Sequence, residues 1–392
     1  MLRKTLIVAV LVSLTLPAET WGIPAFARRY KASCLMCHEP VPKLNAFGET
    51  FAGNGFRMAT GEVPRDTIGT SDPLLALASN VPIALRVDAY IQGYSKGSAS
   101  TDFQTPYIIK LLASGPISRS ISYYMYVNLL ERGEFGGFED AILIFNDIGG
   151  IPLDLNVGQF QVSDPLFKRE LRLMFEDYIV YRANIGDEPV NLTYDRGLMA
   201  SVDVLGFTVT GQLLNGKGID PAQSDRRFDD NGFKNLAGHI TRDITGFLRL
   251  GAFGYYGQSD SEGQENEVSM IGGDGTLSLG IVEVNGQYLH REDTNPTFAA
   301  DGRLVKSDGG FVEAVVRPAG SRLHAFGLYN LMTATAPVLN PRVGTGSGLS
   351  KYESWTGGVG YLLMRNFKLT GEMTWDTQLE QARWTLGFVT AF

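Results

Sequence analysis

Several features are scarce or missing in this sequence, and each absence removes a class of protein. The chain has no Ser/His/Asp or Cys/His arrangement typical of nucleophilic enzymes, and no glycine-rich loop for cradling phosphate. Its net charge of −8 argues against nucleic acid as a partner. After the N-terminal segment no stretch approaches about 18 apolar residues, so a membrane-inserted form must be a closed β-barrel, which satisfies its own backbone hydrogen bonds.

Charged residues are also few, at 19% of the chain against about a quarter in a typical protein. Glycine is abundant instead, with 46 of 392 residues. Low charge with much glycine and many aromatic residues is typical of a membrane barrel. The length suits either two soluble domains or one small domain with a large barrel, so length alone does not decide.

The first 22 residues have the pattern of a secretory signal peptide. Arg3 and Lys4 precede an apolar run at 5–16, and small residues follow it. The run has about 12 residues, too few for the roughly 20 of a spanning helix. We expect cleavage near Gly22, with Ala18 and Ala27 as alternative sites.

The two cysteines lie in the run Cys34, Leu35, Met36, Cys37, His38, which is the C-x-x-C-H pattern of c-type haem attachment. Two thiols at this spacing add to the haem vinyl groups, and the adjacent imidazole is then the proximal iron ligand. A structural zinc site would need further ligands, and no second cysteine pair exists. A disulfide or a thioredoxin-like redox pair remains an alternative.

Residues 23–60 form the predicted haem segment. An apolar repeat at i, i+3 and i+7 predicts one amphipathic helix that starts near Pro42 and ends at Gly53 or Gly55. The repeat consists of Leu44, Phe47 and Phe51. This apolar face can cover one side of a haem but is too small for an independent core, so we expect the segment to dock against the rest of the chain.

The sixth ligand of the haem iron is a separate question. Met58 is the nearest thioether outside the attachment loop, and Met/His ligation would raise the haem potential. Met36 lies inside the loop, where its geometry is poor. Alternatively, Met58 only packs, and water, an amide or a barrel residue lies at the iron. The remaining imidazoles are more typical of lumen or loop positions: His239, His290 and His324.

Basic residues directly precede the haem motif. They are Arg28, Arg29 and Lys31. Arginine pairs readily with carboxylates, so these side chains are candidates for binding the haem propionates. A solvated basic turn is the alternative.

From about residue 82 onward the pattern changes from helical to an alternation of apolar and polar residues, seen clearly at 85–92, 207–213, 282–288 and 367–376. Soluble β-sandwiches also alternate, so the loops supply the second argument. Short turns near 115–118, 205–206, 243–245, 279–281, 318–321 and 365–366 alternate with long polar loops at 217–231, 293–307 and 335–350. Outer-membrane barrels have this layout, with the short turns in the periplasm.

The predicted fold is therefore mainly β: a linker at 61–81, then a transmembrane outer-membrane β-barrel at 82–392, preceded by a small α-helical monohaem cytochrome c plug. At roughly 19 residues per strand and loop, the barrel has about 16 strands, within a range of about 14–18. Eighteen strands are possible if Asp195–Gly197 is a turn. The final alternating strand ends at Phe392, which resembles the assembly signal of outer-membrane barrels.

Acidic residues are frequent in the predicted loops. They are Asp225, Asp229, Asp230, Asp260, Glu262, Glu265 and Glu267. They are either solvated loop residues or a surface that attracts hydrated cations. Their oxygen ligands suit iron and Mg or Ca alike, so no specific iron site is predicted.

The haem segment carries a resemblance to a known family over residues 27–58. The matching positions are Tyr30, Cys34, Cys37, His38, Pro42, Leu44, Asn45, Phe47, Gly48, Phe51, Asn54 and Gly55. This run resembles the N-terminal cytochrome of the fused monohaem cytochrome c-porins, which include the outer-membrane iron oxidases of iron-oxidising bacteria. The order of signal peptide, single C-x-x-C-H motif, linker and barrel is similar as well.

The resemblance implies a protein in the outer membrane of a Gram-negative bacterium, surrounded by outer-membrane lipid, that oxidises extracellular Fe(II). The electron would pass through one covalent haem c to a periplasmic carrier such as a soluble cytochrome c. By this resemblance Cys34, Cys37 and His38 hold the haem, and the chain is a possible Fe(II)-oxidising oxidoreductase. The alternatives are a porin or channel with a structural or sensory haem plug, a conduit for another donor, and a soluble periplasmic cytochrome with a β-sandwich partner.

Overall fold

The structure is a computed structural model. It describes residues 25–58, 62–64, 67–72, 75, 77, 79, 82–97, 100–229, 231–261, 263–343 and 348–392. The predicted signal peptide, 1–22, lies outside the described residues, as does part of the predicted linker. None of the helices in these ranges is long and apolar enough to cross a membrane.

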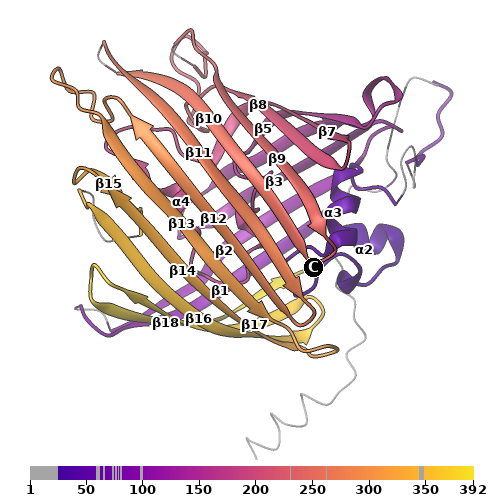
Figure 1. Cartoon of the computed structure of the whole chain (residues 1–392). Coiled ribbons are helices and arrows are strands. Elements are labelled where there is room, and N and C mark those ends of the chain that lie inside the picture. The colour runs from indigo at the N-terminus through magenta and orange to yellow at the C-terminus, as the bar shows by residue number, and fades with distance from the viewer. Residues whose placement is uncertain are drawn as a thin grey trace, which may run out of the picture.

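Sixteen strands of the described chain form one closed antiparallel barrel (Figure 1), which confirms the predicted strand number. Each strand pairs with its neighbours in the sequence, and β1 pairs with β18 to close the ring. The barrel strands are β1 (Ile83–Tyr94), β2 (Thr101–Pro116), β3 (Ile121–Glu131), β4 (Gly137–Phe145), β5 (Leu153–Gln161), β7 (Tyr194–Val204), β8 (Phe207–Leu214), β9 (Asn235–Thr245), β10 (Leu248–Ser261), β11 (Gln264–Leu279), β12 (Val282–Asp293), β13 (Val305–Val316), β14 (Leu323–Ala334), β16 (Lys351–Met364), β17 (Phe367–Asp376) and β18 (Gln381–Ala391). The β-sandwich alternative is therefore wrong, because the sheet closes on itself.

The shorter elements lie before the barrel or in its connections. They are α2 (Ala25–Tyr30), η1 (Cys34–Met36), α3 (Ala46–Gly53), η2 (Ile148–Gly150), η3 (Arg169–Leu171), α4 (Ile179–Arg182), β6 (Asn184–Ile185) and β15 (Leu339–Asn340). The predicted helix after the haem motif is present as α3. It starts at Ala46 rather than near Pro42, because the side chain of Asn45 accepts a hydrogen bond from the Gly48 N–H and caps the helix there.

The barrel wall is apolar outside and polar inside. On β18, Trp384 and Leu386 are 40% and 54% exposed, while Thr385 between them is fully buried. On β1, Asp88 and Gln92 are buried on the lumen side. A soluble protein has the reverse arrangement, and this one is typical of a barrel that faces lipid.

The two ends of the barrel differ. We call the end where β1 begins and β18 finishes the turn end, because the connections at 117–120, 205–206, 280–281 and 365–366 lie there and are short. The opposite, loop end carries the longer connections. These include 215–234, 294–304 and 335–350. The predicted division between short turns and long loops is confirmed.

Residues 25–58, here called the plug, lie at the turn end beside the C-terminus (Figure 1). Two backbone carbonyls of the plug accept hydrogen bonds from the barrel: Gly55 from the Ser122 Oγ at 2.7 Å, and Gly53 from the Asn146 Nδ2 at 3.0 Å. The expected docking of this segment against the rest of the chain is confirmed.

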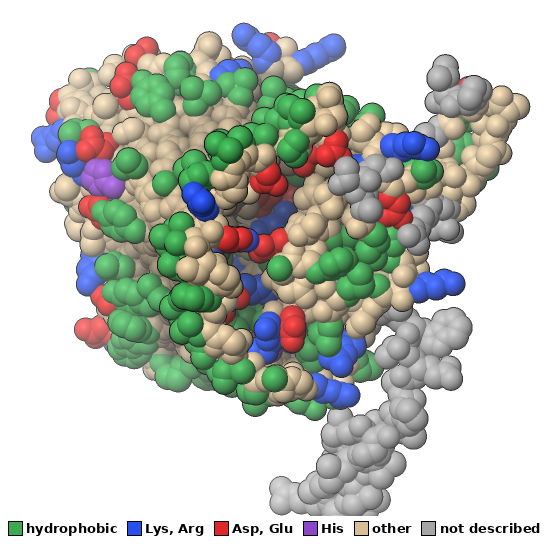
Figure 2. Space-filling view, turned by 45° about the vertical axis from the view of Figure 1, so that its right-hand side comes forward, with side chains coloured by type: hydrophobic (Ala, Val, Ile, Leu, Met, Phe, Trp, Pro, Cys, Tyr) green, Lys and Arg blue, Asp and Glu red, His purple; other side chains and the backbone are tan. Residues whose placement is uncertain are grey.

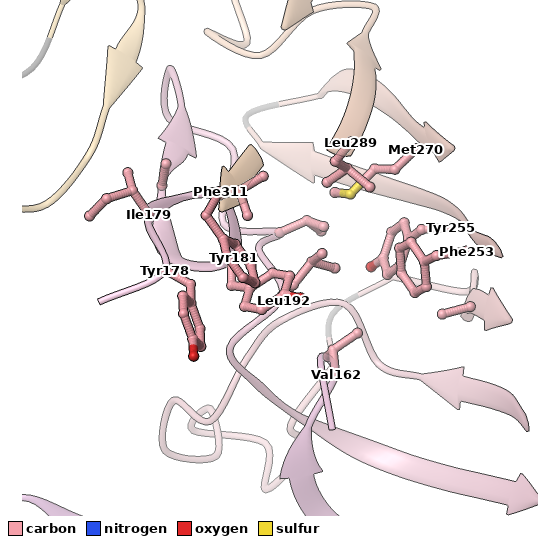
Figure 3. Close-up of a cluster of buried hydrophobic side chains, with 14 of the residues drawn as sticks. Val162, Tyr178, Ile179, Tyr181, Leu192, Phe253, Tyr255, Met270, Leu289 and Phe311 are labelled. Atoms are coloured by element: carbon pink, nitrogen blue, oxygen red, sulfur yellow. The ribbon is translucent and has the colours of Figure 1, made fainter. Parts of the chain in front are cut away.

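One long connection, residues 162–193 between β5 and β7, folds into the lumen and is here called the inner loop. Its Tyr178 stacks on the inward-facing Phe311 of β13 at 4.1 Å between ring centroids, and Tyr181 packs edge-on against the same ring (Figure 3). The 18-strand alternative is therefore wrong: Asp195–Gly197 lies within β7, and the residues before it fill the barrel instead of lining it.

Candidate functional site

The haem motif lies on a tight turn of the plug. The 3₁₀ turn η1 spans the first cysteine, and the N–H groups of Cys37 and His38 both donate to the Cys34 carbonyl, at 3.2 and 2.9 Å. Both cysteines are free thiols, and burial raises the pKa of each. Both cysteines and the histidine line one cavity of about 390 Å³ between the plug and the barrel.

The His38 ring is held in a defined tautomer. Its Nδ1 lies 2.6 Å from the Pro42 carbonyl oxygen. A carbonyl only accepts, so Nδ1 carries the proton and Nε2 keeps its lone pair. Burial also lowers the pKa of His38, which favours the neutral ring. A neutral imidazole whose other nitrogen donates to the backbone is the form in which histidine binds a metal.

Helix α3 supports the turn from behind. The Asn45 side chain that caps the helix also donates from Nδ2 to the Met36 carbonyl at 3.2 Å. A Cβ atom on Gly48 would lie 2.2 Å from the Cys37 carbonyl oxygen, so only glycine allows the helix to approach this closely. The sequence therefore fixes the attachment loop through a cap and a close backbone contact.

Aromatic and aliphatic side chains form most of the cavity wall. Phe56 of the plug stacks on Tyr124 of β3 at 5.5 Å, and Met58 lies on the same wall. Ile142 and Ile144 contribute from β4. The cavity is apolar and brings together the two thiols, the neutral His38 imidazole and the Met58 side chain. Such a cavity fits a c-type haem, in which Cys34 and Cys37 would form the thioether bonds.

The basic side chains at this cavity are not the ones that the sequence indicated. Arg28 instead donates to the Ile83 carbonyl, Arg29 lies against Gly115, and neither lines the cavity; nor does Lys31. The cations on its wall come from the barrel and the inner loop. They are Arg86, Lys168, Arg365 and Lys368. Residues adjacent to the motif in sequence point to the turn-end surface because α2 docks there.

Buried polar contacts hold the plug at the turn end of the barrel. Arg57 is 1% exposed and donates to Ser122 Oγ at 3.0 Å, to Asn146 Oδ1 at 2.8 Å and to the Arg119 carbonyl. On the opposite side Lys43 pairs with two carboxylates of the lumen wall, Glu283 and Glu313. Burial favours the neutral amine, but these carboxylates outweigh it and raise the pKa of Lys43.

Two further cavities lie between the haem-motif cavity and the loop end. The first, here called the chamber, has about 250 Å³ and shares Arg86 with the haem-motif cavity. The second, here called the vestibule, has about 650 Å³ and reaches Tyr94 at the loop end of β1. Inward residues of β1 border the three spaces in order: Ala84, Arg86, Asp88, Tyr90, Gln92 and Tyr94.

The chamber is strongly charged. Figure 2, turned toward the end that carries the plug, shows a hollow with acidic and basic side chains inside it. Five carboxylates line the chamber: Asp88, Glu131, Glu139, Glu170 and Asp177. Seven basic side chains line it: Arg86, Lys110, Arg132, Arg169, Arg172, Arg182 and Arg342.

Comparison of structures finds similar barrels, whereas comparison of sequences finds no match. No protein-family model matches the chain, and no curated protein matches it. Among solved structures, the anion-selective porin from Comamonas acidovorans has 11% identity and a TM-score of 0.57, over 80% of this chain and 99% of that one. The outer membrane channel DcaP of Acinetobacter baumannii has 12% identity and a TM-score of 0.56, over 80% and 97%.

The chain has a porin fold. At these identities the likeness shows the fold alone, over 80% of the chain. None of the other three histidines lines the haem-motif cavity: His239 contacts Asp274 at 2.9 Å, and His290 contacts Asp308 at 2.9 Å. His324 lies on β14 and lines none of the described cavities either.

Of the acidic residues in the predicted loops, Asp260 and Glu265 lie opposite each other on β10 and β11, while others pair with cations. Asp225 pairs with Arg227, and Asp229 pairs with Lys234. Asp230 and Glu262 lie outside the described residues. Among the residues that the structure describes, no three His, Cys, Asp or Glu side chains are placed to hold a metal ion.

Sequence reasoning missed the arginines of the inner loop, which provide much of the chamber wall. Arg172 and Arg182 fall within residues 171–205, where the sequence leaves the number of strands open, and Arg169 lies just before that stretch. A usable signal was present, because 162–193 lacks the alternation of its neighbours and combines basic residues with a buried apolar set. A non-alternating segment between two barrel strands is a candidate for folding into the lumen.

Proposed function

We propose that this chain is an outer-membrane porin-like barrel that carries one covalent c-type haem in its turn-end mouth and passes electrons through it. One observation carries the proposal: Cys34, Cys37 and His38 line an apolar cavity between the plug and the barrel, and the His38 Nε2 is available to bind a metal. The porin fold supports the barrel part. The haem and electron-transfer parts rest on the motif and on this cavity, together with the resemblance to the cytochrome c-porins.

The barrel surface supports the membrane location. Trp355, Trp375 and Trp384 are exposed on the neighbouring strands β16, β17 and β18, toward the loop end. Tryptophan on the outside of a barrel typically lies at the membrane–water interface. We infer that the loop end faces the outside of the cell and the plug faces the periplasm, as in barrels with short periplasmic turns.

In this proposal each residue has a role. Cys34 and Cys37 would attach the haem, and His38 and Met58 would bind its iron. The haem, when bound, supplies one-electron exchange. The plug side chains exclude water from one face, while the vestibule and chamber allow a donor to approach from the loop end. We propose Fe(II) as that donor and a periplasmic carrier such as a soluble cytochrome c as the acceptor.

A second candidate function is a channel whose haem plug is structural or sensory. The observation that favours it is the porin fold itself, which is shared with proteins named as channels and porins. Conductance of the purified protein in lipid bilayers separates the two. A conductance that is large and does not respond to haem reduction would favour the channel.

The test begins with the cofactor. A pyridine haemochrome spectrum of the purified protein is expected to show a c-type band that disappears in the variant with Cys34→Ser and Cys37→Ser. Outer membranes carrying the protein are then mixed anaerobically with Fe(II), and reduction is followed in the haem absorbance. Absence of the c-type band would refute the haem. A haem that Fe(II) fails to reduce would refute only the iron donor. Met58→Ala is expected to change the spectrum and lower the potential.

A further inference from the structure

The boundary between the vestibule and the chamber is basic. Six residues line both spaces: Tyr107, Arg132, Phe175, Asp177, Arg182 and Arg342. Three of them are arginines, and one is a carboxylate. Because these side chains border both spaces, they lie where the vestibule and the chamber adjoin.

The single carboxylate at this boundary is already engaged. Asp177 accepts two hydrogen bonds from Arg169, at 2.5 and 3.1 Å. Arg182 is a second ion-pair partner of Asp177, at 3.6 Å, so one carboxylate faces two guanidinium groups; Arg182 also donates to the Arg342 carbonyl oxygen at 2.7 Å. Arg172 likewise donates to two backbone carbonyls, those of Arg169 and Glu176. Backbone carbonyls satisfy hydrogen-bond donors but do not neutralise the charge.

The arginines are close enough to affect one another. Burial lowers the pKa of the Arg182 guanidinium, and the neighbouring cations Arg169, Arg132 and Arg172 lower it further, while Asp177 opposes this. A bound anion would relieve the repulsion between these guanidinium groups. Guanidinium groups also bind carboxylate and phosphate oxygens in a bidentate manner.

We propose that Arg132, Arg182 and Arg342, backed by Arg172, form a binding site for a small anion with two or more negative charges on carboxylate or phosphate oxygens. The chamber volume of about 250 Å³ sets the size limit. The first three arginines line the vestibule and the chamber but not the haem-motif cavity, so the site is separate from the haem. It would remain even if the protein carried no haem.

The experiment is calorimetric titration of the full-length protein in detergent, at low ionic strength, with citrate and separately with inorganic phosphate. Arg182→Gln and Arg342→Gln are each expected to weaken binding about tenfold, the range for one charged hydrogen-bond partner. Arg182→Lys keeps the positive charge but loses the bidentate hydrogen bonding of the guanidinium group, so an intermediate affinity is expected. The relative affinity of the two probes identifies whether carboxylate or phosphate is preferred.

Arg303→Gln is the matched control. Arg303 is an exposed residue of the 294–304 loop at the same end of the barrel, and it lines none of the three cavities. It removes the same charge and is expected to leave the affinity unchanged. Absence of binding to both probes, or equal losses in Arg303→Gln and Arg182→Gln proteins, would overturn the proposal. Heat-modifiable gel mobility checks that each variant still forms the barrel.

Discussion

Single residues of the plug are constrained by backbone proximity to the barrel. Gly55 has a φ of +61°, and a Cβ atom there would lie 2.2 Å from Asn146 Oδ1 and 2.6 Å from Ser122 Oγ. Both of those groups hold the plug, since they bond Arg57 and the plug backbone. An added methyl group would therefore both strain the backbone and separate these partners.

We predict that Gly55→Ala destabilises plug docking by about 1–2 kcal/mol from the backbone conformation alone, with a further loss from the displaced bonds. Hydrogen exchange measured by mass spectrometry over residues 25–58 is expected to accelerate at least tenfold. Gly53→Ala is the matched control, because a Cβ atom there would meet no atom within 4 Å. Equal exchange in the two variants would contradict the prediction.

At the scale of elements, the inner loop depends on a buried ion pair. Burial favours the neutral acid, but Arg169, Arg172 and Arg182 outweigh it and hold the pKa of Asp177 well below its usual range. A carboxyl with a depressed folded pKa contributes stability above its unfolded value of about 3.9, and this contribution is lost as the pH falls below that value.

We therefore predict that acid loosens the inner loop before the barrel. Hydrogen exchange of residues 162–193, corrected for intrinsic rates, is expected to speed up below about pH 4. Asp177→Asn should loosen the loop at neutral pH and flatten this response, because Arg169 then lies buried without its partner, at a cost of about 3–5 kcal/mol when burial is complete. Asp225→Asn in the exposed 215–234 loop is the control. It should change neither the exchange of residues 162–193 at neutral pH nor its acceleration in acid.

The plug offers a second comparison at this scale. Arg57 is buried and bonds three barrel groups, whereas Arg249 pairs with Glu49 of the plug on the surface. Exposed ion pairs contribute about 0–1 kcal/mol, and losing a buried charged group with its bonds costs more.

We predict that Arg57→Ala frees the plug and that Arg249→Ala barely affects it. Limited proteolysis of the folded protein is expected to cut within residues 25–58 at least tenfold faster in the first variant. High salt should not reproduce the effect of Arg57→Ala, since Arg57 is buried and its hydrogen-bond acceptors are neutral groups. Similar cleavage rates for both variants would mean that the Arg57 contacts do not hold the plug.

For the whole molecule, the charge of the lumen affects which donor reaches the haem. A basic boundary repels a hydrated divalent cation and attracts an anionic complex. If the chamber is the route, Fe(II) bound in an anionic citrate complex should reduce the haem faster than aqueous Fe(II), by on the order of tenfold at low salt.

The same difference is expected to shrink at high salt and in a variant with both Arg182→Gln and Arg342→Gln. Stopped-flow measurement of the haem absorbance under anaerobic conditions checks this. Citrate-bound and aqueous Fe(II) differ in reduction potential, so the ratio of their rates of haem reduction is not decisive by itself. The test is whether this ratio changes with salt and in the double variant. A ratio that is insensitive to both would mean that electrons enter by another route.

The sequence by itself determined the periodic and local features. Alternation separated the two faces of each strand, because the side-chain period of a strand is two. The length of the barrel region, at roughly 19 residues per strand and loop, predicted about 16 strands within a range of about 14–18, and the structure has sixteen. The pattern of short turns and long loops predicted two unlike ends. The C-x-x-C-H run placed Cys34, Cys37 and His38 together because five consecutive residues cannot separate far.

Only the tertiary structure decided what meets across the lumen. The inner loop has no period that reveals its path, and its place follows from burying Tyr178 and Tyr181 against Phe311, 130 or more residues away in the chain. The same holds for the cations at the haem-motif cavity, which come from β1, the inner loop, the 365–366 turn and β17 rather than from Arg28 or Arg29. Contacts between distant segments depend on barrel closure and register, and a local pattern carries no information about either.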